Sequence, residues 1–151
     1  MLVGCVSTEK RQSNIESDIA EIYSDYSSEI QHFFAEEAFN AGVQEIRAMK
    51  PSEKRPPVNE YEGVGCAYGI WQRKLILIEI NQPRCVLLSV LAHEISHIGS
   101  KCGAHNDVFY KYNFGVAKRY QERFPSAAKR RWFAPVQDVA SVAAIYRSEG
   151  C

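Results

Sequence analysis

The stretch LAHEISHIGSKCGAHNDVF, residues 91–109, holds three of the four histidines in this chain of 151 residues. His93 and His97 enclose a glutamate in the pattern H-E-x-x-H, and His105 follows after a spacer of seven residues. On a helix, residues four apart share one face about 6 Å apart along the axis, so both imidazoles can reach one ion. Glu94 is turned about 100° from His93, which leaves its carboxylate within reach of a water on that ion. The spacing predicts a metal site with one Zn²⁺ per chain and a carboxylate beside the water on that ion.

Catalytic zinc sites use three protein ligands and leave one position open for water. His105 is the first candidate for the third ligand, because Gly99 and Gly103 allow the chain to turn back toward the helix. Glu122 on the following segment is the second candidate. Cys102 is the third, although a thiolate this close is more typical of a structural zinc site.

The segments around the motif alternate between helical and extended patterns. Residues 83–98 carry apolar side chains at helical spacing, and we expect Gly99 to stop this helix. The other expected elements are a helix over 13–41 capped by Ser13 or Asn14, a short strand near 43–49, a hairpin of 63–69 and 74–80, a helix over 106–123 and a terminal helix over 136–147.

This order, α-β-β-β-α-α-α, predicts an α+β fold with a small three-stranded sheet. At 151 residues the chain is long enough for one domain with its own core. We expect a flexible N-terminal segment over 1–12 and a single domain over 13–151. The proline-rich residues 50–62 are expected to form a surface loop.

Two parts of the sequence resemble the small SprT-like and WLM-type zinc metallopeptidases. H-E-I-S-H (93–97) followed by A-H-N-D-V-F-Y (104–110) is similar to their active-site helix and to the third histidine that opens the next helix. A-Y-G and L-I-L-I-E-I-N upstream resemble the hairpin that precedes that helix. The resemblance covers roughly residues 40–120 and implies a zincin-like, minimal gluzincin-type domain.

Carried over to this chain, the resemblance implies that His93, His97 and His105 bind zinc and that Glu94 is the general base. It also implies that Phe109 packs behind His105. Two features depart from the pattern: the spacer after His97 is shorter than in many SprT-like proteins, and the cysteine ribbon that often follows their core is absent. The DNA-linked roles of some relatives are therefore not carried over.

These observations predict a zinc-dependent metallopeptidase that acts on a peptide or protein. The strand over 75–80 is expected to pair with an extended substrate. Tyr112, seven residues after His105, is a candidate for stabilising the oxyanion, with a role as a core or rim aromatic as the alternative. Glu79 or Asp138 is expected to orient a ligand imidazole.

Two other classes of function stay open. A catalytically inactive zinc-binding interaction module is the first, although an intact Glu94 argues against it. Nucleic-acid binding is the weaker second: residues 101–151 carry 9 basic and 4 acidic side chains, including the run KRRWF at 129–133, whereas residues 1–62 carry 6 basic and 12 acidic ones. Two solvated faces of opposite charge are the favoured explanation of this distribution, and nothing else in the chain supports nucleic-acid binding.

The opening residues bear on location. Leu2–Cys5 resembles the end of a bacterial lipoprotein signal, followed by a polar tether, but the charged and apolar regions of a signal peptide do not precede it. A cytoplasmic enzyme and a lipoprotein anchored through Cys5 are both consistent with this pattern. Cys66, Cys85, Cys102 and Cys151 could pair in an oxidising compartment or remain thiols. The oligomeric state is left open.

Overall fold

The computed structural model describes residues 7–49, 67–70, 73–80 and 84–125. Its elements are α1 (Thr8–Ile22), α2 (Ser28–Ala41), β1 (Glu45–Ala48), β2 (Ala67–Ile70), β3 (Leu75–Ile78), α3 (Arg84–Ser100) and α4 (Asp107–Arg123). The expected α+β class and the three-stranded sheet are confirmed. Leu2–Cys5, the proline-rich loop, KRRWF and the expected helix over 136–147 lie outside the described residues.

The single helix expected over 13–41 is wrong, because the structure has two helices there. Ser7 caps α1 by accepting the N–H of Lys10, so this helix begins before Ser13, and residues 8–12 are helical. Ser27 caps α2 in the same way. The side-chain amide of Gln31 donates to the carbonyls of Tyr23 and Tyr26 at 3.0 and 2.9 Å, which satisfies the backbone where the chain bends.

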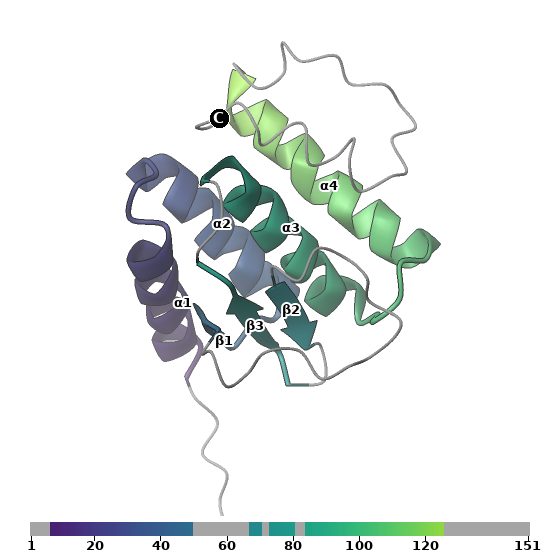
Figure 1. The fold of residues 1–151 in the computed structure, drawn as a ribbon, viewed down its shortest axis with the longest axis horizontal. Helices are drawn as coiled ribbons and strands as arrows, with labels where there is room; N and C mark the ends of the chain where they lie inside the picture. Colours follow the sequence, from purple (N-terminus) through teal and green to yellow (C-terminus); the bar gives the residue numbers. More distant parts are fainter. Residues whose placement is uncertain (1–6, 50–66, 71–72, 81–83, 126–151) are drawn as a thin grey trace, which may run out of the picture.

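The four helices lie side by side in the order α1, α2, α3, α4, and each contacts the next (Figure 1). The sheet packs against α1 at one end and α3 at the other. A buried core joins these layers, with Ile15, Ile19, Phe34, Ile76 and Leu91 among its most enclosed members. Among the helices in the described part of the chain, none is long and apolar enough to span a membrane.

The strand order is β1-β3-β2, with β1 parallel and β2 antiparallel to β3. The hairpin of β2 and β3 is therefore confirmed. All four residues of β3 are buried, which suits a strand that is paired on both sides. The carboxylate of Asp18 on α1 accepts the N–H of Ile46 at 3.0 Å, so the outer edge of β1 is covered by α1.

Two contacts fix α4 against the rest of the fold. The guanidinium of Arg119 forms a two-pronged ion pair with the buried Glu37 of α2 at 2.6 and 2.8 Å. Nearer to the histidines, Ser96 of α3 and Asn113 of α4 meet inside the helix interface, with 3.2 Å between Oγ and Oδ1. Helix α4 is thus held to α2 through Arg119 and to α3 through Asn113.

Candidate metal centre

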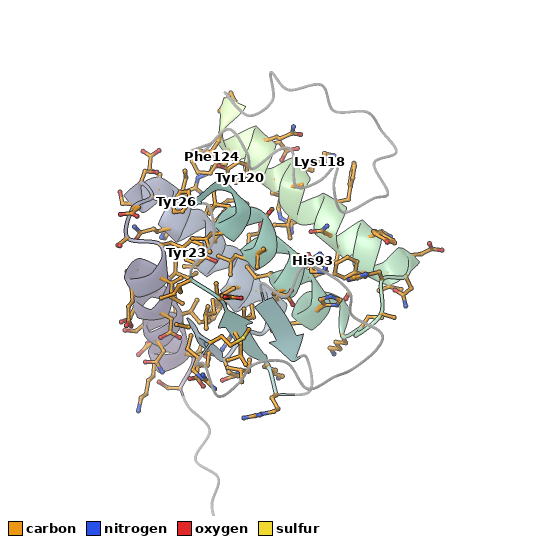
Figure 2. The ribbon with its side chains drawn as sticks, in the orientation of Figure 1. Tyr23, Tyr26, His93, Lys118, Tyr120 and Phe124 are labelled. Atoms are coloured by element: carbon orange, nitrogen blue, oxygen red, sulfur yellow. The ribbon has the colours of Figure 1, made fainter. Side chains whose placement is uncertain are left out.

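Helix α3 carries the first two histidines on one face, as the spacing predicted. His97 is almost fully buried and His93 is half-buried. Their Nε2 atoms are 3.2 Å apart. Figure 2 shows His93 on the α4 side of α3, whereas Tyr23 lies near α1 and α2.

The end of α3 differs from the prediction that Gly99 would stop it. The helix continues to Ser100, and Lys101 then takes a left-handed conformation with φ 53°. The N–H of Lys101 donates to the carbonyl of Ile98, and the N–H of Cys102 donates to that of His97, each at 3.2 Å. This is a Schellman turn, which ends a helix and reverses the chain.

Gly99 allows two helices to pack closely and does not end α3. A Cβ at this position would collide with the ring and hydroxyl of Tyr112, so glycine allows α4 to approach α3 closely.

The same turn orients His97. Its Nδ1 lies 2.7 Å from the carbonyl oxygen of Cys102, and only a protonated Nδ1 can donate to that oxygen. In the neutral ring, Nε2 then carries the lone pair that a metal requires. The orienting partner is therefore a backbone carbonyl for this ligand, where the sequence had suggested the carboxylate of Glu79 or Asp138. Glu79 is exposed just after β3, and Asp138 lies outside the described residues.

His105 joins the pair from the start of α4. Asn106 caps that helix by accepting the N–H of Phe109 at 3.1 Å. The Nε2 of His105 lies 3.0 Å from that of His93 and 3.2 Å from that of His97. The structure thus brings together all three histidines that the sequence proposed as ligands, and their nitrogens form a nearly equilateral triangle.

The ring of Phe109 closes one side of this triangle. Its centroid lies 4.8, 4.4 and 4.8 Å from the ring centroids of His93, His97 and His105, and the residue is fully buried. The expected packing of Phe109 behind His105 is confirmed. The apolar ring of Phe109 therefore packs against all three imidazoles at once.

The donor set fits a zinc ion. Tetrahedral zinc holds its nitrogen ligands at about 2.0–2.1 Å, which puts those nitrogens roughly 3.3 Å from one another. The observed separations of 3.0–3.2 Å are close to this value. Nitrogens at such distances either share a proton in a hydrogen bond or direct their lone pairs at a common cation. Three imidazoles also match the number of protein ligands in a catalytic zinc site.

The protonation of the cluster also favours metal binding. Burial lowers the pKa of His93 to about 3, with contributions from the charges of His97 and His105. Burial likewise lowers the pKa of His97, against a hydrogen bond to Cys102 that raises it, and burial lowers that of His105. The imidazoles are therefore neutral near pH 7, and zinc does not have to displace protons from them.

These shifts predict an acid-sensitive apoprotein. In the unfolded chain His93 takes up a proton as the pH falls below its ordinary pKa of 6.5. In the folded chain it stays neutral until the pH reaches about 3. The free energy of unfolding of chelator-treated protein should therefore fall by about 2 kcal/mol between about pH 7 and about pH 5. Urea unfolding at a series of pH values measures this. In His93→Gln the decrease should be smaller, and an equal decrease would contradict the assignment.

Glu94 is buried, with 7% of its surface exposed. The charge of its carboxylate reaches Tyr23 on the interior side of α3. The pKa of Tyr23 is raised well above its ordinary value of 10.0, first by burial, then by Tyr26 and then by Glu94. The carboxylate of Glu94 is thus shielded from bulk water on the side of α3 that faces Tyr23.

The structure does not bring Tyr112 to the histidines. Its ring lies on Gly99, which is two residues beyond His97 and so about 200° around the helix. Burial and the charge of Glu37 raise the pKa of Tyr112, and the charge of Arg119 lowers it. Tyr112 therefore lies on the side of α4 that carries the ion pair of Arg119 with Glu37. Among the tyrosines that the structure describes, Tyr110 has a ring contact with the cluster: its centroid lies 6.4 Å from that of His105. Sequence reasoning missed Tyr110, although it directly follows Phe109.

The two alternative third ligands are placed elsewhere. Glu122 is exposed near the far end of α4, where it lines a surface hollow with Glu36 and Arg119. Cys102 is a free thiol beside the cluster. Within the described residues, the group of potential ligand atoms within 4.8 Å of one another consists of the three histidines alone.

Comparison of the chain with models of known protein families, with curated proteins and with solved structures finds no match in any of the three.

Proposed function

We propose that this protein is a zinc-dependent metallopeptidase with a zincin-like fold. The observation that carries the proposal is the triangle of three Nε2 atoms, with Phe109 packed against the three imidazoles. The resemblance to SprT-like and WLM-type peptidases points the same way, and it makes Glu94, the buried residue that follows His93, the general base. The number of imidazoles and their neutral state both suit zinc in a hydrolytic site.

His93, His97 and His105 would hold the metal. Zinc in such a site acts as a Lewis acid and lowers the pKa of bound water toward about 7. Glu94 would take the proton from the attacking water and pass it to the nitrogen of the leaving amine. The carbonyl of Cys102 would keep the lone pair of His97 directed at the metal.

The sheet offers one place for an extended peptide. The sequence suggested the strand over 75–80, but β3 is the central strand and its backbone is paired on both sides. The outer edge of β1 is covered by α1 through Asp18. Among the described residues no strand pairs with the other edge of β2, and β2 packs against α3. A substrate strand would therefore add to β2, beside the helix that carries the histidines.

Removal of the metal should abolish hydrolysis. We expect the zinc-loaded protein to cleave an unfolded substrate such as casein, and 1,10-phenanthroline to reduce that cleavage to background. Zinc added after the chelator is removed should restore it, because the ligands remain in the chain. Cleavage that persists after the metal has been shown to be absent would contradict the proposal. A protein that binds one zinc and cleaves nothing would favour the inactive interaction module.

A further inference from the structure

Several hydrogen bonds of the turn between α3 and α4 involve one residue, Cys102. Its backbone N–H donates to the carbonyl of His97, and its carbonyl lies 2.7 Å from the Nδ1 of the same histidine. Both contacts are made by backbone atoms, so any residue other than proline could make them at this position. The contacts of the sulfur are specific to cysteine and reach the other side of the site.

The sulfur holds both neighbours of His105. The thiol donates to the carbonyl of Ala104 at 3.3 Å, and the side-chain amide of Asn106 donates to the sulfur at 3.0 Å. The orientation of that amide is fixed, because its oxygen accepts the N–H of Phe109 as the cap of α4. The NH₂ group is thereby directed at Cys102.

His105 needs such support more than the other two histidines. His93 and His97 are held by the backbone of α3, whereas His105 lies before the first residue of α4 and is exposed. A loop residue of this kind loses conformational entropy when it binds a metal, and contacts that order it beforehand reduce that loss.

We propose that Cys102 is a positioning residue that holds His105 ready for the metal through its sulfur, and that it is not itself a ligand. The inference rests on the proposed metal centre. It assigns a role to the thiol that the sequence had offered only as an alternative ligand.

Three variants of the full-length protein test the role of the sulfur. Cys102→Ala removes both side-chain hydrogen bonds and should weaken zinc binding by about tenfold, because the sulfur orders the residues on either side of His105. Cys102→Ser keeps a donor and an acceptor and should stay within about threefold of wild type. Ser100→Ala is the matched control, because its hydroxyl donates to the carbonyl of His97 at 3.4 Å but touches neither neighbour of His105. Competition with a chromogenic chelator measures each affinity.

Asn106→Ser provides a second test if Cys102→Ala fails to fold. Serine keeps the cap of α4 but loses the NH₂ group that donates to the sulfur, so zinc binding should weaken several-fold. Zinc affinity equal to wild type in Cys102→Ala, or in Asn106→Ser where the alanine variant does not fold, would overturn the proposal. So would an equal loss in the serine and alanine variants of Cys102. A cobalt–thiolate charge-transfer band in the cobalt-loaded wild type would also overturn it, because the sulfur would then be a ligand.

A measurement without metal separates this inference from the proposed function. If the wild type binds no zinc, the metal centre itself is disproved. Amide hydrogen exchange of Phe109 in the metal-free protein still reports on the turn, because that N–H is bonded to Asn106. Faster exchange in Cys102→Ala but not in Cys102→Ser would support the positioning role of the sulfur. Equal exchange in wild type and Cys102→Ala would overturn it.

Discussion

Replacing Glu94 by glutamine is expected to lower peptide hydrolysis by about 10²–10⁴-fold while the zinc content stays at one ion per chain. The substitution keeps the size and burial of the side chain but removes the group that accepts a proton. It leaves all three imidazoles in place, so the loss should appear in kcat rather than in metal affinity. Steady-state cleavage of casein, together with elemental analysis of the same samples, measures both quantities.

Glu122→Gln is the matched control for this change. Glu122 is an exposed glutamate near the far end of α4 and makes no part of the histidine cluster. We expect wild-type turnover from this variant. Equal turnover by the wild type and Glu94→Gln would disprove the role of Glu94 as base, whatever metal the protein holds.

Loss of His105 is expected to weaken zinc binding by about a hundredfold or more, since two imidazoles on α3 would then have to hold the ion alone. In the structure its Nε2 completes the triangle at 3.0 and 3.2 Å from the other two nitrogens. Zinc titration of His105→Ala against a chelator of known affinity measures the change. His32→Ala replaces the fourth histidine, which is exposed on α2, and should bind zinc as the wild type does.

An unchanged zinc affinity in His105→Ala would show that the third ligand is another residue. Glu122→Ala would then be the next variant to measure. Glu122 is nevertheless a poor candidate for the third ligand, because it lies far along α4 from the other two histidines. It follows His105 by seventeen residues, and a helix rises about 1.5 Å per residue.

The histidine cluster could be predicted because it depends on local geometry. The four-residue spacing of His93 and His97 determines their common face on any helix. The short spacer predicted the return of His105, although the left-handed residue that makes the turn is Lys101 and not one of the two glycines. The resemblance to known peptidases supplied the place of Phe109 behind the third histidine.

The errors concern features that depend on distant parts of the chain. The apolar pattern through Ile22 and Tyr26 continued across the bend between α1 and α2, because Tyr26 is buried there as well. Ser27, the cap of α2, signalled this bend, and Ser7 signalled the start of α1, but neither cap was recognised. Gly99 was interpreted as a helix stop, whereas the ring of Tyr112 uses the space that its missing side chain leaves.

The sheet order could have been anticipated in part. The uninterrupted apolar run Leu75–Ile78 lacks the alternation of a half-exposed strand, and such runs are typical of strands in the middle of a sheet. A central strand has no free edge for a substrate. The parallel pairing of β1 with β3 could not be predicted, because a contact between residues thirty positions apart, such as Ile46 with Ile76, leaves no local pattern.

The three imidazoles come from thirteen consecutive residues, and this has a consequence for the order of folding. Only a short loop must close to bring His93 and His105 together, so the entropy cost of closing it is small. The packing of α3 against α4 offsets this cost. The parallel contact of β1 with β3 closes a much longer loop and is expected to form later. The three imidazoles are therefore expected to come together within the hairpin of α3 and α4 before the sheet forms. A metal ion added at the start of refolding would then bind before the sheet has formed.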